Sequence, residues 1–549
     1  MGRLSSIASS ARQSVADAVF EAKVLREAGI LGLERPDKAI RVGSAFVRWG
    51  ASPALGITTA AIHHPHETAL IDERGSLSFE QLHRRSNALA HAFAKMGIGY
   101  GDGVGVMCRN HRGFVEATLA AAKLGASALY LNTMFAGPQL VEVTRREKPK
   151  ALVYDEEFAD LLDGVDESVG RIVGWADDPT EATTIDSLVA ANDDSNLKPP
   201  PDKPRFVILT SGTTGTPKGA QRSSPDGLLA LAALIDRIPF RSRETMMIAA
   251  PLFHSWGFFH FIMSLPTSST IVLRRRFDEG GTLQAVQEHR AQVLAVVPVM
   301  LQRILQLPKE TLASYDLSSL RITSASGSTL PGEMAIEWMD RFGDTVYNLY
   351  GSTEVYAATV ATPEDLRAAP GTAGRPPRGT VVRLYDEEGR EVPQGQVGRI
   401  FVGNEMSFEG YTGGGGKEEI DGLLCSGDVG HVDSDGRLFI DGRDDEMIVS
   451  GGENVFPREV EDLLADHEAV ADVAVVGVED EEYGQRLKAF VVAAPEAEAS
   501  EEELKAHVKA HLASYKAPRE IEFLDELPRN ATGKVLKRKL RERETQRSA

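Results

Sequence analysis

The chain has 549 residues, 42% of them hydrophobic, and its 80 acidic and 60 basic residues give a formal net charge of −20. This length exceeds what one hydrophobic core usually supports, so we expect at least two domains, and the acidic balance argues against nucleic acid as a general partner. No stretch approaches the roughly 20 uninterrupted apolar residues of a membrane span, and two cysteines, Cys108 and Cys425, cannot make a disulfide framework, which favours a cytoplasmic protein.

The segment 1–55 is expected to be a leader, whose structure the sequence does not define. Its start matches the M-G-x-x-x-[ST] acylation pattern through Gly2 and Ser6, and it is rich in serine. Acidic Asp17 and Glu21 follow within a helix-like stretch, so we favour a plain leader helix over targeting or lipidation. Any membrane association is expected to be peripheral at most.

Helical and strand patterns then alternate, as they do in α/β proteins. Ser78 and Gln81 have the spacing of a capping box at the head of an amphipathic run. A strand is predicted over 104–107, a helix over 113–126 and another strand over 128–131.

The stretch TSGTTGTPKG at 210–219 follows a short apolar strand pattern. Its glycines allow close approach of backbone to a ligand, its hydroxyls donate hydrogen bonds and its lysine adds charge, a combination suited to phosphate. The P-loop pattern GxxxxGK[ST] fails here, because Pro217 precedes Lys218 and Gly219 follows it. A Ser/Thr/Gly-rich surface turn is the alternative. We therefore predict a different phosphate loop, with contacts from Thr210, Ser211, Gly212, Thr213, Thr214, Gly215 and Lys218.

Buried strand patterns cover 291–300, 320–326 and 345–351, each near helical segments. From Thr380 the pattern changes to short antiparallel strands, with DSDG at 433–436 as a hairpin turn. Past Arg443, alternating helices and strands predict a small α+β domain.

Four further stretches follow the phosphate loop in order: NLYGSTE at 348–354, SGD at 426–428, GRDDEMIVSGGENVFPREVE at 442–461 and LPRNATGK at 527–534. Together they resemble the adenylate-forming superfamily, and most closely its fatty acyl-CoA ligase branch, from about Ser78 to Lys539. The resemblance implies an α/β fold with stacked sheets and an antiparallel β subdomain in a large N-terminal domain. Its expected units are a leader (1–55), the large domain (56–441), a hinge (442–446) and a small mobile α+β domain (447–549).

The resemblance also implies an ATP site. Tyr350 would stack on adenine, Thr353 would bind the α-phosphate and Glu354 would hold Mg²⁺, which prefers oxygen ligands. Asp428 would accept hydrogen bonds from ribose, and Arg443 would contact ribose and phosphate. Taken alone, these side chains could be a packed tyrosine, surface acids and an exposed arginine. Further ATP or AMP contacts are expected from Gly327, Asn348, Gly351, Ser352 and Lys534.

Two reactions share this site in the family. A carboxylate attacks the α-phosphorus of ATP, giving acyl-AMP and pyrophosphate, and the thiol of coenzyme A then attacks the acyl carbonyl and releases AMP. Lys534 would serve the first reaction and leave when the small domain rotates at Asp445, after which Ser450, Gly451 and Gly452 would line the path of the thiol. The expected catalytic residues are Lys218, Thr353, Glu354 and Lys534.

The stretch PLFHSWGFFHF at 251–261 matches the family segment that lines the acyl and thiol tunnels. His254 holds the usual histidine position, with Trp256 nearby. Some long-chain relatives carry a gating tryptophan where this chain has Phe258, so that gate is not expected. An apolar, unbranched acid is predicted, and Gly351 would leave room for it beside adenine.

Other departures from the family are Arg399, where relatives often have glutamate, and Asn454, where some have an arginine that contacts phosphate. The main hypothesis is a ligase that uses ATP, Mg²⁺ and coenzyme A on a medium- or long-chain fatty acid, as a monomer or a homodimer. An aryl-acid CoA ligase, a luciferase-like enzyme and a non-catalytic nucleotide-binding regulator are the alternatives. An amino-acid adenylation domain is less favoured, because FHSW lacks the aspartate that usually holds the amino group.

Overall fold

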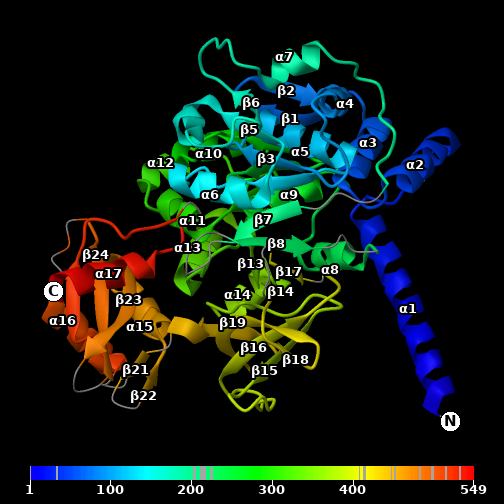
Figure 1. Cartoon of the computed structure of the whole chain (residues 1–549). Helices are drawn as coiled ribbons and strands as arrows, with labels where there is room; N and C mark the ends of the chain where they lie inside the picture. Colours follow the sequence, from blue (N-terminus) through cyan, green and yellow to red (C-terminus); the bar gives the residue numbers. More distant parts are fainter. Residues whose placement is uncertain are drawn as a thin grey trace.

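The computed structural model describes residues 2–32, 35–201, 206–210, 218–222, 227–406, 408–411, 416–446, 448–450, 453–480, 484–495, 497, 500–512, 516–530 and 533–548. Within these ranges the strands form four sheets (Figure 1). Two large sheets and one smaller sheet belong to the part of the chain that ends at Arg443, and the fourth follows it.

A seven-stranded sheet has the order β17-β8-β7-β4-β3-β5-β6. Its strands from β3 to β7 are parallel. At one edge, β8 pairs antiparallel with β7, and β17 pairs antiparallel with β8. The strands are β3 (Gly103–Met107), β4 (Ser127–Tyr130), β5 (Ala151–Asp155), β6 (Gly170–Trp175), β7 (Phe206–Thr210), β8 (Lys218–Arg222) and β17 (Phe408–Tyr411).

An eight-stranded sheet has the order β14-β13-β12-β11-β9-β10-β1-β2 and is parallel except for its two outermost pairs. Its strands are β1 (Thr68–Asp72), β2 (Gly75–Ser78), β9 (Thr245–Ile248), β10 (Thr270–Leu273), β11 (Val293–Val296), β12 (Ile322–Ala325), β13 (Val346–Ser352) and β14 (Tyr356–Ala361).

Helices and the two large sheets stack in layers, with the largest core between the sheets. That core receives side chains from α3 (Pro53–His63), α4 (Phe79–Lys95), α5 (Arg112–Leu124), α8 (Leu229–Arg237) and α9 (Ser255–Ser264). A second core covers the other face of the eight-stranded sheet with α10 (Glu279–Glu288), α11 (Pro298–Leu305), α12 (Lys309–Ala313), α13 (Gly332–Phe342) and α14 (Pro363–Ala368). A third covers the other face of the seven-stranded sheet with α6 (Gly137–Glu147) and η1 (Glu156–Leu162).

Two five-stranded sheets complete the molecule. The antiparallel one contains β15 (Val381–Tyr385), β16 (Gly398–Gly403), β18 (Glu419–Ile420), β19 (Leu423–Val432) and β20 (Leu438–Arg443). The other, beyond η2 (Asp444–Glu446), contains β21 (Ile448–Ser450), β22 (Glu453–Val455), β23 (Val470–Asp480), β24 (Gly484–Ala493) and β25 (Glu520–Phe523). Its helices are α15 (Pro457–Ala465), α16 (Glu501–His511) and α17 (Lys537–Ser548). The expected combination of a large α/β unit with an antiparallel subdomain and a small α+β unit is confirmed.

Local rules account for several boundaries. The Ser78 hydroxyl accepts from the Gln81 backbone at 3.2 Å and the Gln81 side chain accepts from the Ser78 backbone at 2.8 Å, so the predicted capping box begins α4. The predicted turn at 433–436 joins β19 to β20. The strand expected over 291–300 was too long: it ends at Val296, because Pro298 begins α11 at a position where its missing N–H is not needed.

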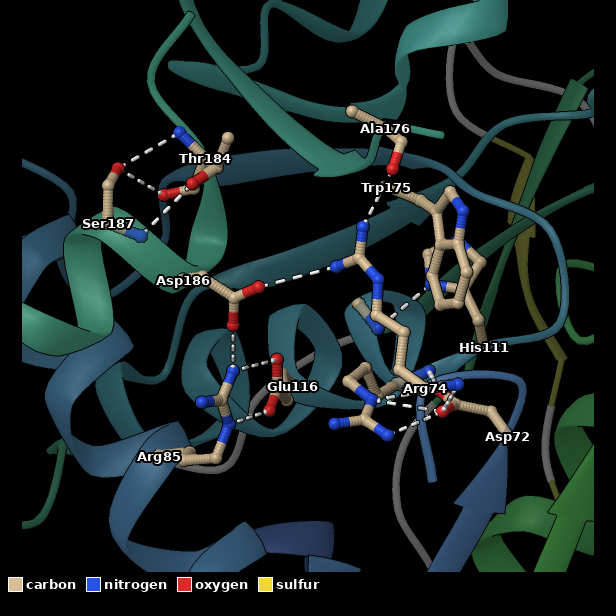
Figure 2. A network of polar contacts seen from close by, with 12 residues as sticks. Asp72, Arg74, Arg85, His111, Glu116, Trp175, Ala176, Thr184, Asp186 and Ser187 are labelled. Carbon is tan, nitrogen blue, oxygen red and sulfur yellow. Dashed lines mark hydrogen bonds and ion pairs between the residues drawn. The ribbon is translucent and has the colours of Figure 1, made fainter. Parts of the chain in front are cut away.

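An ion network joins the two large sheets, and none of its residues lines the cavity described below (Figure 2). Trp175, at the end of β6, contacts the guanidinium groups of Arg74 and Arg275, which lie 4.0 and 4.9 Å from its ring centroid. Arg74 also donates to the Ala176 carbonyl at 2.8 Å and to the Asp186 side chain at 3.3 Å. Asp186 lies in α7 (Ile185–Ala190). These contacts fix the sheets relative to each other.

The leader segment is helical. It forms α1 (Gly2–Glu27) and α2 (Pro36–Trp49), which precede α3. The C-terminal part of α1 packs into the largest core through Val24 and Leu25, and its N-terminal end points away from the body of the molecule (Figure 1). In the part of the chain that the structure describes, no helix has the length and apolar content needed to cross a membrane.

Candidate active site

A cavity of about 790 Å³ lies where the eight-stranded sheet, the antiparallel sheet and the small C-terminal unit meet. Residues that follow β11 and β12, residues of β13 and the start of α9 form one wall, because parallel strands bring their carboxyl ends to the same edge of a sheet. β19 and β20 form a second wall, and α15 and the segment before α17 form a third.

Half of the predicted site residues line this cavity: His254, Trp256, Gly327, Asn348, Tyr350, Gly351, Ser352, Thr353, Glu354, Asp428, Arg443 and Lys534. These residues are far apart in the sequence, and the fold brings them together around the cavity.

The other predicted residues lie elsewhere or cannot be placed. Thr210 is the last residue of β7 and pairs with Lys218, the first residue of β8. Asp445 lies in η2, and Ser450 is the last residue of β21. Outside the described residues are Ser211, Gly212, Thr213, Thr214, Gly215, Gly451 and Gly452. Phe258 is buried against Tyr130 and Phe206, with ring centroids 4.8 and 5.3 Å away, and does not line the cavity.

Tyr350, Asp428 and Arg443 form one polar group. The Tyr350 hydroxyl donates to one Asp428 oxygen at 2.6 Å, and Arg443 donates to the other at 3.1 Å. Burial, together with the adjacent Asp428 carboxylate, raises the pKa of Tyr350 well above its ordinary value. The phenol is therefore neutral, and its ring and the carboxylate are held in a fixed orientation at the cavity wall.

Two cations converge beside this group at Gly427, which has φ +84°. A Cβ atom at this position would lie 3.3 Å from Arg443 Nη2 and 3.5 Å from Lys417 Nζ. Glycine thus leaves room for both charges, and the acidic protein presents local positive charge to an anionic ligand.

Glu354 is held by two hydroxyl groups. Tyr411 donates to Glu354 Oε1 at 2.7 Å and Ser352 donates to Oε2 at 2.9 Å. Burial and the Glu354 carboxylate raise the pKa of Tyr411, so the tyrosine stays a donor. Each carboxylate oxygen keeps a lone pair for a further partner, and an anchored oxygen donor of this kind fits a Mg²⁺ ion bound together with phosphates.

Two buried polar atoms at the cavity accept no hydrogen bond from the described residues: Asn348 Oδ1 and His254 Nε2. Burial lowers the pKa of His254 to about 4, so the imidazole is neutral near pH 7. Buried polar atoms without a partner cost free energy, and hydrogen bonds with a bound ligand would remove that cost.

The apolar end of the cavity is formed by the start of α9. Trp256 stacks on Phe259 with ring centroids 5.4 Å apart, and its indole donates to the Val296 carbonyl at 3.0 Å. The indole is thus fixed at the ends of β11 and β12, beside Leu330 and Met334 in the cavity wall.

Lys534 reaches the cavity on a tight loop of the small unit. Its backbone N–H donates to the Asn530 side chain at 2.9 Å, and Arg529 binds Asp472 at 2.6 Å. A Cβ atom on Gly533, which has φ +77°, would lie 2.1 Å from a Val299 methyl group in α11. Only glycine lets this loop approach the large unit so closely.

Sequence reasoning missed three contributors to the site. Tyr411 and Lys417 lie far beyond the phosphate loop in the sequence, and Tyr411 acquires its position through the pairing of β17 with β8. Gln302 of α11 lines the cavity and donates to the Ala471 carbonyl of the small unit at 3.0 Å. No local sequence signal marks any of them.

Comparisons with known proteins agree with this geometry. The AMP-binding enzyme family matches residues 57–412, and the AMP-binding enzyme C-terminal domain matches residues 459–534. The chain is 32% identical to the fatty acid–[acyl-carrier-protein] ligase ScoC of Streptomyces coeruleorubidus, over 88% of this chain and 94% of that protein. It is also 32% identical to an indoleacetate–CoA ligase of Aromatoleum aromaticum, over 87% of this chain and 95% of that protein.

A solved structure of the anthranilate CoA ligase AuaEII in complex with anthranoyl-AMP superposes with a TM-score of 0.81 at 26% identity, covering 90% of this chain and 97% of that one. The chain therefore belongs to the AMP-binding enzyme family, and within the adenylate-forming superfamily it is an acid–thiol ligase of the acyl- and aryl-CoA ligase type.

Proposed function

We propose that the protein joins a medium- or long-chain fatty acid to coenzyme A at the expense of ATP. In the first step an oxygen of the fatty acid carboxylate bonds to the α-phosphorus of ATP, and the bond to pyrophosphate breaks. In the second step the sulfur of coenzyme A bonds to the acyl carbonyl carbon, its proton is lost, and AMP leaves. The net products are acyl-CoA, AMP and pyrophosphate.

One observation carries this proposal: a single cavity combines nucleotide-type polar groups with an apolar end. Tyr350 and Asp428 suit an adenosine, Lys534 supplies a positive charge, and Trp256 offers an uncharged wall for an acyl chain. A neutral His254 adds no charge at that end. The name of the Streptomyces relative, a fatty acid ligase, supports the same class of acid.

In this proposal the side chains act by binding and by electrostatics. Asp428 and Arg443 hold the ribose, Thr353 binds the α-phosphate, and Lys534 and Lys218 stabilise the charge that develops on the phosphate oxygens. A Mg²⁺ ion held by Glu354 would neutralise phosphate charge. Further nucleotide contacts come from Gly327, Asn348, Gly351 and Ser352.

The second step is proposed to use a different placement of the small unit. In the structure that unit meets the cavity through α15, the start of β23 and the loop of Lys534, the arrangement suited to the first step. We place the hinge at Asp445, within residues 442–446, between a large domain at 56–441 and a small domain at 447–549. Rotation there would withdraw Lys534 and bring the segment of Ser450, Gly451 and Gly452 to the acyl-AMP.

An aryl acid is the second candidate substrate class. The fixed Trp256 indole offers a flat face suited to stacking with an aromatic acid, and the relatives named above as indoleacetate and anthranilate ligases support this class.

Thioester formation with a panel of acids from acetate to oleate, including benzoate, cinnamate and indoleacetate, tests the assignment. The proposal predicts the highest kcat/KM for an acid of six to eighteen carbons, rising with chain length up to the limit of the cavity at about 0.8 kcal/mol per CH₂. A higher kcat/KM for any aryl acid would favour the second candidate. Release of pyrophosphate with no acid dependence would reject both.

A further inference from the structure

Helix α11 of the large unit touches the small unit at two points beside the cavity. The Gln302 side chain donates to the Ala471 carbonyl at 3.0 Å, and Val299 faces the backbone of Gly533, where a Cβ atom would lie 2.1 Å from a Val299 methyl group. Val299 and Gln302 are three positions apart, so they lie on the same face of the helix. All four residues line the cavity.

The other side of α11 is fixed in the large unit. The helix begins at Pro298, two residues after β11 ends. Leu301 and Ile304 are completely buried in the second core, on the side opposite to Val299. The helix is therefore a firm support, and a loop that rests on it has a defined position relative to the cavity.

The acceptor for Gln302 belongs to a β-bulge at the start of β23. Val470 and Asp472 pair with neighbouring residues of β24, so Ala471 between them is one residue too many for the ladder. The extra residue of a bulge is left out of the regular pairing of a sheet. The Ala471 carbonyl is thereby available to a partner on α11, and Gln302 is that partner.

From Ala471 the contacts continue to the loop that carries Lys534. The carboxylate of Asp472, the next residue in the chain, accepts from Arg529 at 2.6 Å. Arg529 also donates to the Gly533 carbonyl, directly before Lys534. Hydrogen bonds and the covalent chain thus connect the Gln302 amide to the backbone of Lys534 without a gap.

We propose that Gln302 is a positioning residue for the first half-reaction, which fixes the place of Lys534 through Ala471, Asp472 and Arg529. The inference rests on the proposed function, because only the formation of acyl-AMP uses Lys534 at the cavity. An amide carries no charge and does not titrate, so Gln302 acts by geometry alone. One neutral hydrogen bond favours this placement of the small unit without preventing its later rotation.

The test measures both half-reactions in Gln302→Met, which keeps the length of the side chain and removes its donor. Acyl-AMP formation should fall about tenfold, and conversion of supplied acyl-AMP to acyl-CoA should stay within about twofold of the wild-type rate. Gln306→Met is the matched control, because Gln306 caps the C-terminal end of α11, is exposed and does not line the cavity. It should leave both rates unchanged.

A double-mutant cycle tests the connection between Gln302 and Lys534. Asp472→Ala breaks a later link, so it should also slow acyl-AMP formation, and Gln302→Met/Asp472→Ala should be no slower than the more damaging single variant by more than about twofold. Losses that multiply would mean that the two residues act independently and would overturn the proposal.

Hydrogen exchange supplies a readout that needs no turnover. In Gln302→Met the amides of residues 527–536 should exchange at least about threefold faster, whereas those of α16, in the same small unit, should keep the wild-type rate. Faster exchange in α16 as well would mean that the small unit is unfolding, and unchanged exchange in 527–536 together with slow adenylation would mean that Gln302 acts on the substrate directly. Either result would contradict the assigned role.

The wild type separates this inference from the proposed function. If the wild type forms no acyl-AMP from any acid, the proposed function fails and the role of Gln302 fails with it. If the wild type forms acyl-AMP and Gln302→Met forms it equally fast, or is slowed equally in both half-reactions, only the role of Gln302 is wrong.

Discussion

At the scale of single residues, the site depends on hydroxyl and carboxylate groups that hold one another in place. Glu354 has a donor on each oxygen, and Asp428 is fixed between a phenol and a guanidinium group. Tyr411 is not among the residues expected to bind ATP, so we assign it the role of positioning Glu354.

Removal of the Tyr411 hydroxyl tests this role. A hydrogen bond to a charged group contributes about 1.5–3 kcal/mol, so Tyr411→Phe should slow acyl-AMP formation about 10-fold to 100-fold and raise the Mg²⁺ concentration needed for half-maximal rate. Glu354→Gln should have the larger effect on both. Tyr385→Phe, which removes a comparable contact to Asp421 at 3.2 Å, is the control. An unchanged Mg²⁺ requirement in Tyr411→Phe would mean that the contact only stabilises the fold.

Buried histidines make stability depend on pH. Burial lowers the pKa of His260 to about 4, whereas an unfolded histidine has a pKa of about 6.5. The unfolded chain therefore binds a proton that the folded chain does not, and stability is lost as the pH falls from about 6.5 to about 4, by about 1.4 kcal/mol per pH unit at this residue.

His260→Leu removes this dependence, so its free energy of unfolding in urea should fall less steeply than that of the wild type between pH 6.5 and 4.5. His66→Leu, at an exposed ring, should keep the wild-type slope. If the free energy of unfolding depended equally on pH in His260→Leu and in the wild type, the folded protein would bind the proton at His260 as readily as the unfolded chain, which contradicts this explanation.

At the scale of elements, local sequence patterns correctly predicted those features that depend on contacts between neighbouring residues. The capping box at Ser78 and the turn at 433–436 depend on neighbours within a few residues, and both are present. The overlong strand at 291–300 failed because apolar residues continue across Pro298 into a helix that is equally buried. Tyr411 could not be predicted, since its contact with Glu354 joins residues 57 positions apart through a strand pairing that no local pattern encodes.

The loop that carries Lys534 gives an element-scale prediction. Gly533→Ala should hinder approach of the loop to α11, because the new Cβ atom would lie 2.1 Å from Val299. We expect a loss of acyl-AMP formation of tenfold or more, with little change in the conversion of supplied acyl-AMP to acyl-CoA. Gly436→Ala, at φ +80° with no atom nearby, has the same backbone strain without the contact and should leave both rates unchanged. Equal losses in both half-reactions would contradict the proposed role of this contact.

At the scale of the whole molecule, the small unit sits so that Lys534 lines the cavity. The five motifs predicted the family because each is a contiguous stretch with its own chemistry, and four of them, at 348–354, 426–428, 442–461 and 527–534, contribute residues to the cavity. The placement of the small unit was not predictable, because it depends on contacts such as Gln302 with Ala471 that form only between folded units.

Under the proposed function one cavity serves two reactions with the small unit in two positions, and the half-reactions of Lys534→Ala test this most directly. A charge delivered to the transition state of adenylation contributes about 3–4 kcal/mol, so formation of acyl-AMP should fall by about 10²-fold to 10³-fold. Conversion of supplied acyl-AMP to acyl-CoA should stay within a few-fold of the wild-type rate, and Lys539→Ala should leave both reactions unchanged. Equal loss in both half-reactions of Lys534→Ala, or no loss in either, would contradict the account.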